Sequence, residues 1–226
     1  MANDTLCTPT DEEFLELKER CKPLFDEDPT QYHDDASLWR FLKAFKTSEF
    51  AYKMLLKTNK WREEMKVDEL NITDPDVEKE FATGKGVLLS QKDNSGRPIL
   101  YISAKKHNAY ERDIDASTKF IVYMLEKAVK KCTPECDNLC IAFDLKDFCM
   151  SNMDYQFVKQ LITVLGKYYP ERLGICLILN APMIFYGCWA IIRPWLHDGT
   201  VSKVTFVYNE KQLEEYLDPT CLPTED

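Results

Sequence analysis

The first seventy residues place apolar side chains at helical spacing between polar ones. "TPTDEEFLELKER", from Thr8, and "DDASLWRFLKAF", from Asp34, each put a hydroxyl or acidic residue before an apolar-periodic run. This order is typical of a capped helix start. A third run, "SEFAYKMLLKTNKWREEM", predicts another helix with Ser48 as its N-cap. Residues 1–70 are therefore predicted to form a helical segment, which ends before "NITDPDV".

Beyond that break the apolar runs become short and continuous. "GVLLSQKDNSGRPILYIS" has two such runs around a turn-rich centre, which predicts a β-hairpin. "LCIAFDL", "ICLILN" and "KVTFVY" follow as strands, with helical patterns between them. Continuous apolar strands joined by helices indicate a mostly parallel, buried sheet. We therefore expect residues 71–226 to form an α/β domain with helices flanking the sheet.

The most apolar stretch, residues 171–196, raises the question of a membrane span. Asn180 and Pro182 divide it into a strand of about six residues and a helix of about thirteen, whereas a span needs about twenty. We expect no transmembrane segment. The helix is apolar over a wider arc than packing on one sheet requires. It is either deeply buried, or it covers a hydrophobic cavity on one side and touches a membrane on the other.

Composition limits the kinds of molecule that this protein is expected to bind. The 226 residues carry a net charge of −9 and are 45% hydrophobic. This charge argues against general binding to nucleic acid or to anionic membranes, so any phosphate contact must come from a few local cations. The start, "MANDTLCTPTDEEF", lacks the features of a signal peptide, and we expect a cytoplasmic protein.

Metal binding and catalysis find little support in the sequence. The nine cysteines are an odd number, so we expect reduced thiols, and the four-residue spacing of Cys132, Cys136 and Cys140 is unusual for zinc. The sequence has neither a glycine-rich nucleotide loop nor a Gly-x-Ser-x-Gly elbow, and its three histidines show no ligand or triad spacing. We predict no metal, no catalytic residues and no enzyme.

Several motifs together resemble one family. "YYPERLGICLILNAPMIFYGCWAIIRPWL", followed by "TVSKVTF", resembles the signature of CRAL-TRIO lipid-binding domains, in particular the yeast-type phosphatidylinositol/phosphatidylcholine transfer proteins. "DNSGRPILY" and "FDLKDFCMSNMDY" fit the same family in the same order, and the resemblance spans about residues 30–223. It implies a helical front segment, and an apolar lipid pocket closed by a gate helix at about Met183 to Leu196. The gate residues expected from it are Phe185, Cys188, Trp189, Ile192 and Trp195.

The resemblance also implies a headgroup site. Similar proteins bind the phosphoinositol headgroup through one lysine near the front, the Glu and Arg of "PER", and the Thr and Lys of "TVSK". The lysines suit a phosphate, while the Glu and Thr suit inositol hydroxyls. For any one of these residues taken alone, a surface ion pair is the more frequent role, and it is the match at five positions that favours a headgroup site. The matching positions are Lys46, Glu171, Arg172, Thr200 and Lys203.

Several positions at which this sequence departs from the family affect which lipid we expect it to bind. Phe45 stands where the family often has an arginine. Leu139 and Ile141 stand where phosphatidylcholine binders have a serine and a threonine, and Leu125 replaces a pocket tyrosine, although Tyr101 is kept. These last four are the expected pocket residues. We expect phosphatidylcholine to bind poorly, and phosphatidylinositol or a less polar guest, such as a sterol or an isoprenoid, to bind better.

The implied function is the binding of one lipid and its exchange between membranes, with phosphatidylinositol favoured. We expect no cofactor apart from the lipid, transient peripheral contact with membranes, no nucleic acid, and a monomer. The alternative is a lipid-sensing or protein-interaction module of a larger signalling or tethering protein. Similar proteins continue beyond the point where this chain ends, at "CLPTED", so a fragment of a longer protein is also compatible with the sequence.

Overall fold

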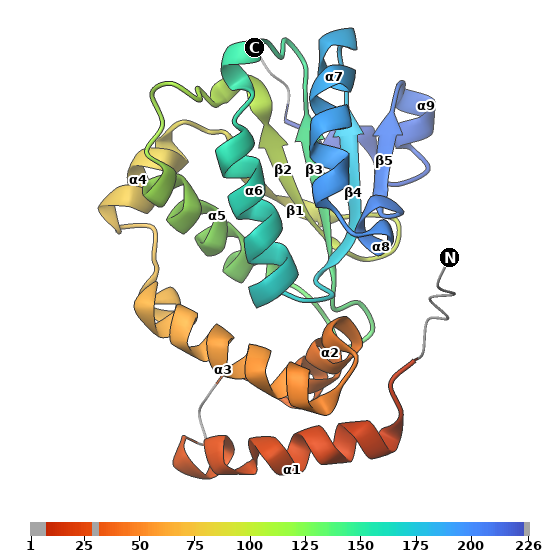
Figure 1. The fold of residues 1–226 in the computed structure, drawn as a ribbon. Helices are drawn as coiled ribbons and strands as arrows, with labels where there is room; N and C mark the ends of the chain where they lie inside the picture. Colours follow the sequence, from red (N-terminus) through yellow and green to blue (C-terminus); the bar gives the residue numbers. More distant parts are fainter. Residues whose placement is uncertain (1–7, 29–31, 224–226) are drawn as a thin grey trace. The chain divides into compact units, whose positions relative to one another are not determined.

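The computed structural model describes residues 8–28 and 32–223. They fall into two compact units (Figure 1). The first contains the described residues up to Asp68 together with Gly166–Glu171, and the second contains Glu69–Leu165 and the described residues from Arg172 onward. The first unit is therefore built from two stretches that lie far apart in the sequence.

The first unit contains the predicted helices α1 (Asp11–Glu27), α2 (Asp35–Phe45) and α3 (Ser48–Glu64). Thr10 and Glu13 form a capping box at the start of α1. The cap of α3 is Thr47 rather than Ser48, because the Thr47 hydroxyl accepts the Phe50 amide while Ser48 is already helical and buried. The buried core of this unit consists of Leu17, Cys21, Leu38, Phe41, Leu42, Ala51, Met54 and Leu55.

The returning segment Gly166–Glu171 joins this unit through aromatic contacts. A π-helical turn, η4 (Val164–Tyr168), leads into it. The Trp61 ring of α3 stacks on Tyr168, with 4.1 Å between the ring centroids, and meets the edge of Tyr169 at 6.1 Å. Stacked and edge-on aromatic pairs add to the free energy gained from buried area.

Among its described residues, the second unit contains a five-stranded sheet in the order β1-β2-β3-β4-β5. β1 and β2 form the predicted antiparallel hairpin, and the other neighbours are parallel, which confirms the mostly parallel sheet. The strands are β1 (Gly86–Lys92), β2 (Pro98–Ser103), β3 (Leu139–Asp144), β4 (Leu173–Leu179) and β5 (Val204–Val207).

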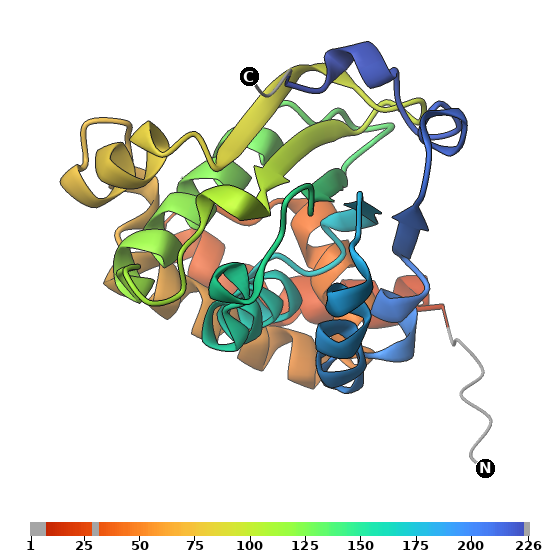
Figure 2. The same ribbon diagram turned by 90° about the horizontal axis from the view of Figure 1, so that it is seen from above.

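Helices connect the parallel strands on one face of this sheet. Figures 1 and 2 show α5, α6 and α7 on the same side of the strands. Right-handed crossovers between successive neighbouring strands require this arrangement. On both faces together, the described part of the second unit contains the helices α4 (Pro75–Ala82), α5 (Ile114–Val129), α6 (Tyr155–Thr163), α7 (Met183–Ile192), α8 (Asp198–Val201) and α9 (Glu210–Leu213). Short 3-10 turns are η1 (Val67–Glu69), which spans the boundary between the units, and η2 (Ala104–Lys106), η3 (Met150–Asn152), η5 (Arg193–Trp195) and η6 (Pro219–Cys221).

The opposite face of the sheet is covered by the C-terminal segment. Leu213 and Leu217 pack there against Leu89, Ile99 and Leu177. The sheet is thus buried on both faces, as continuous apolar strands require. Within the described residues, no helix combines the length and the apolar character needed to cross a bilayer.

Candidate functional site

The predicted gate segment begins at Met183 but does not stay α-helical to Leu196. α7 ends at Ile192, and Arg193–Trp195 form the 3-10 turn η5. Pro194 lies in this turn, and a proline has no amide to continue the α-helical hydrogen bonds. The segment is therefore a three-turn helix with a tighter end.

One side of this segment packs onto the body of the second unit. Phe185 and Cys188 are buried together with Cys176 and Ile178 of β4. Trp189 is half-buried and meets the Phe206 ring of β5 edge-on, with centroids 5.6 Å apart. Among the expected gate residues, Phe185, Cys188 and Ile192 are buried, while Trp189 and Trp195 are half-buried.

The other side of α7 is also apolar. Met183 is 85% exposed, Ile184 49% and Ile191 50%. Sequence reasoning did not single out these three as the outward side, because every face of the helix is apolar and periodicity gives no direction. Exposed large apolar side chains gathered on one element indicate a contact surface.

The face of the sheet that the helices cover carries a row of uncharged side chains. Strand register aligns Leu100, Ile141, Cys176 and Val204 across four neighbouring strands. None of these side chains carries a hydroxyl group. Leu139 lies two residues before Ile141 in β3, so both side chains point to the same face of the sheet, and both are buried. The expected pocket residue Leu125 is also fully buried, in α5, which packs against β1 and β2.

The position of Tyr101 differs from the one predicted from the sequence. It lies on the opposite face of the sheet, where it packs with Ile99, Cys140 and Ala142. Its hydroxyl donates to Asp144 Oδ2 at 2.7 Å. The prediction that Tyr101 lines the same pocket as Leu139 and Ile141 is wrong, because successive residues of a strand face opposite sides. Leu100 occupies the corresponding position on the helix-covered face.

The expected headgroup residues are distributed over both units. Lys46 is the C-cap of α2, with a left-handed φ of 66°, and Glu171 has a φ of 58°; both belong to the first unit. Arg172, Thr200 and Lys203 belong to the second unit. Arg172 is buried, and its guanidinium donates to the Asp137 carbonyl. The grouping of these five residues into one headgroup site stays a prediction.

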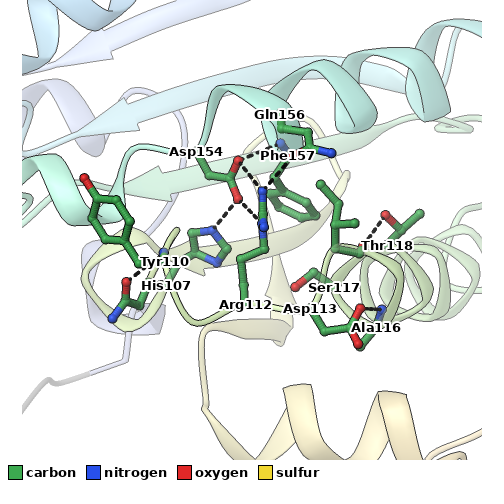
Figure 3. Close-up of polar contacts among 12 residues, drawn as sticks. His107, Tyr110, Arg112, Asp113, Ala116, Ser117, Thr118, Asp154, Gln156 and Phe157 are labelled. Carbon is green, nitrogen blue, oxygen red and sulfur yellow. Dashed lines mark hydrogen bonds and ion pairs between the residues drawn. The ribbon is translucent and has the colours of Figure 1, made fainter.

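A polar network that sequence reasoning missed fixes the start of α6. Figure 3 shows His107 and Arg112 directed at Asp154. Arg112 Nε lies 2.6 Å and His107 Nε2 3.3 Å from Asp154 Oδ2, and Asp154 Oδ1 accepts the Phe157 amide as the N-cap of α6. Burial raises the pKa of Asp154, but hydrogen bonds from Arg112, the Phe157 amide and His107 outweigh it and leave that pKa below its usual value. Burial and the positive charge of Lys85 lower the pKa of His107.

Comparisons with known proteins place this fold in a family. The family model of the CRAL/TRIO domain matches residues 82–225. A CRAL-TRIO domain-containing protein of Schizosaccharomyces pombe is 36% identical over 193 residues, which are 82% of this chain and 43% of that protein. The phosphatidylinositol transfer protein CSR1 of Eremothecium gossypii is 34% identical over 149 residues, which are 66% of this chain and 34% of that protein. This chain thus spans less than half the length of these two relatives.

A shorter relative and a solved structure extend the comparison. The Sec14 cytosolic factor of Schizosaccharomyces pombe is 29% identical over 192 residues, which are 77% of this chain and 67% of that protein. The crystal structure of Sfh5 superimposes with a TM-score of 0.70 at 16% identity, covering 91% of this chain and 82% of that one. At this identity the superposition shows the fold alone.

Proposed function

The chain belongs to the CRAL/TRIO domain family, and we propose on that basis that it binds one lipid molecule and exchanges it between membranes. One structural observation carries the proposal: α7 is apolar on both sides. Phe185 and Cys188 face the sheet, while Met183 and Ile184 face solvent. A helix of this kind suits a gate that covers an apolar site and meets a membrane when it moves.

The energetics of lipid transfer explain why a gate is needed. Each acyl CH₂ contributes about 0.8 kcal/mol when it leaves water, so two chains of about sixteen carbons cost on the order of 25 kcal/mol to expose. A protein that extracts such a lipid must present an equally apolar site without exposing it to water beforehand. Opening only at the membrane surface, by displacement of a covering segment, meets both conditions.

We propose phosphatidylinositol as the preferred lipid. The relative CSR1 carries the name of a phosphatidylinositol transfer protein. Leu100, Ile141 and Cys176 offer no hydroxyl donor for the phosphate of a choline lipid. The family resemblance gives candidate groups for an inositol phosphate in each unit, with cations for the phosphate and hydrogen-bonding groups for the ring. They are Lys46 and Glu171 in the first unit, and Arg172, Thr200 and Lys203 in the second.

Lipid exchange of this kind also implies where the protein acts and what it needs. The protein would act in the cytoplasm as a monomer, contact membranes only transiently, and need no cofactor beyond the lipid itself. It would carry out no covalent chemistry, since exchange requires only opening and closing around the guest.

Native lipid extraction tests the proposal. The full chain is purified without detergent and denatured, and the released lipids are identified by mass spectrometry; exchange of phosphatidylinositol and of phosphatidylcholine between vesicles is then measured. We expect phosphatidylinositol at close to one molecule per chain, and little transfer of phosphatidylcholine. Robust phosphatidylcholine transfer, or a sterol at that ratio, would overturn the lipid assignment. A protein that carries no lipid and takes none from vesicles would overturn lipid exchange itself.

A further inference from the structure

The two ends of the α7–η5 segment are held by different kinds of contact. The Asn180 end is tied into a hydrogen-bonded network around a buried carboxylate. The Trp195 end rests on side chains of α6, one of which is exposed to solvent. This difference bears on how the gate opens, a question that rests on the proposed lipid exchange.

The network at the first end surrounds Asp144, which terminates β3 and is 7% exposed. Tyr101 donates to its Oδ2 at 2.7 Å, and Asn180 Nδ2 donates to its Oδ1 at 2.8 Å. Asn180 lies between β4 and α7 and has a φ of 53°. Asparagine adopts this left-handed conformation more readily than most residues. The direction in which the chain enters α7 is therefore fixed by charge-assisted bonds to a buried group.

The second end is held by aromatic and cation–π contacts. The Tyr155 ring meets the Trp195 ring edge-on, with centroids 5.8 Å apart. Lys159 Nζ lies 4.5 Å from the centre of the Trp195 ring. Lys159 is exposed, so competing anions can reach its ammonium group. Exposed cation–π pairs are weak and depend on the desolvation of the cation.

The exposed side chains of the segment include both apolar and cationic groups. Met183, Ile184 and Ile191 are exposed on α7, and Arg193 is exposed in the same turn as Trp195. Arg193 is the one Asp, Glu, Lys or Arg residue in the sequence between residues 181 and 196. The net charge of −9 does not prevent attraction here, because salt screens charges beyond about 8 Å. Anionic lipid surfaces attract such cations, and tryptophan favours the level of the headgroups.

We propose that the segment opens from its Trp195 end and that an anionic lipid surface is the partner that releases it. At such a surface, lipid anions bind the Lys159 ammonium and draw it away from the Trp195 ring. Trp195 then enters the interface beside Ile191, while the Asn180–Asp144 bond keeps the other end in place. A neutral lipid surface carries no net charge to compete for Lys159, so opening there is slower.

Vesicle exchange with matched variants tests this proposal. The full chain exchanges a fluorescent phosphatidylinositol with vesicles of phosphatidylcholine alone, or with about one-fifth phosphatidylserine. We expect wild type to be faster on the anionic vesicles. Lys159→Met removes the cation and keeps the aliphatic stem, so we expect about two- to fivefold faster exchange on neutral vesicles and a smaller response to phosphatidylserine. Lys159→Arg should behave as wild type, because arginine forms the same contact.

Lys130→Met is the matched control. Lys130 is an exposed lysine at the end of α5, and its substitution removes the same charge from the same unit. We expect it to leave the neutral-vesicle rate unchanged. Equal effects of the two methionine variants would show general charge attraction and overturn the release mechanism, as would a Lys159→Met variant that exchanges lipid like wild type on both vesicles.

A second readout does not require exchange. Quenching of Trp195 by brominated lipid is obtained as the difference between wild type and Trp195→Phe. We expect quenching to require phosphatidylserine in the wild-type background and to appear on neutral vesicles in the Lys159→Met background. If lipid exchange fails but this pattern holds, the proposed function is wrong and the release mechanism stands. If quenching is absent on every vesicle, or is unaffected by Lys159→Met, the release mechanism is wrong.

Discussion

Gly174 is a position where one methyl group would have no room. A Cβ built there would overlap Asn138 Oδ1 and Arg97 Nε. These atoms cannot easily give way, because Arg97 Nε donates to Asn138 Oδ1 at 2.9 Å and Arg97 Nη1 lies 3.2 Å from Asp93 Oδ2. We expect Gly174→Ala to lower the free energy of unfolding by about 1–3 kcal/mol in chemical denaturation.

Gly187→Ala is the control for that prediction. Apart from its chain neighbours and the backbone of its own helix, no heavy atom lies within 4 Å of the Cβ position of Gly187, which is inside α7. Alanine favours helix over glycine by up to about 1 kcal/mol, so this variant should be neutral or more stable. A similar loss of stability in both variants would mean that crowding at Gly174 is not the cause.

His33 should make the first unit sensitive to acid. Burial lowers the pKa of the His33 ring to about 4, from an ordinary 6.5, although its Nε2 lies 2.8 Å from Asn59 Oδ1. The unfolded chain therefore takes up the proton first, and stability falls as the pH drops from about 6.5 to about 4. The loss is on the order of 3 kcal/mol, from about 1.4 kcal/mol per unit of pKa difference.

Denaturant unfolding across this pH range measures the effect. Wild type and His33→Gln are compared between pH 7 and pH 4.5. The variant cannot take up the proton, so its stability should depend less steeply on pH. Parallel curves for the two proteins would contradict a neutral His33 in the folded state.

At the scale of elements, α6 depends on its N-cap residue, Asp154, for orientation. Asp154 caps the helix and accepts from Arg112 and His107, which come from the loop before α5 (Figure 3). Removing the carboxylate leaves a cationic guanidinium and a buried imidazole without this partner. We expect Asp154→Ala to cost about 2–3 kcal/mol, since a cap alone contributes about 1 and charged hydrogen bonds add to it.

Asp113 offers a comparison on the neighbouring helix. It caps α5 by accepting the amides of Asp115 and Ala116, and its side chain is exposed. Asp113→Ala therefore removes a cap without stranding a buried partner, and thermal unfolding should show the smaller effect. Losses of equal size would indicate that the bonds to Arg112 and His107 contribute nothing.

At the scale of the whole molecule, the C-terminal segment decides whether the second unit has two covered faces. Asn94 ties the segment to the hairpin turn, through its amide to the Tyr216 carbonyl at 2.7 Å and its side chain to the Glu214 carbonyl at 2.8 Å. Leu217 is fully buried against the sheet. Leu217→Ala should cost about 2–5 kcal/mol, the usual range for a buried leucine.

A chain ending at Tyr208 should have a larger defect. It exposes the apolar face that contains Ile99, Ala142 and Leu179, so we expect dye binding to exposed apolar surface and aggregation on size exclusion. A chain ending at Leu222 keeps the contacts of Leu213 and Leu217 and serves as the control. A monomeric, dye-free product from the shorter chain would show that the sheet does not need this cover.

Many features of this architecture depend only on residues that are close together in the sequence. The capping box at Thr10, the cap at Asp34 and the turn between β1 and β2 each depend on residues within a few positions of one another. The alternation of apolar strands with helices was sufficient to predict a mostly parallel sheet. The family resemblance located α7 and its buried residues Phe185 and Cys188.

The tertiary structure decided what depends on partners distant in the chain. Strand register placed Tyr101 on the face away from Ile141, and a shift of one residue in a strand reverses the side to which its side chain points. Asp154 accepts a hydrogen bond from Arg112, which is 42 residues away in the sequence, and the Trp61 ring stacks on that of Tyr168. The sequence also did not indicate which side of α7 faces outward, because all its faces are apolar. Local preferences set where elements begin and end, whereas burial across the whole chain sets which faces meet.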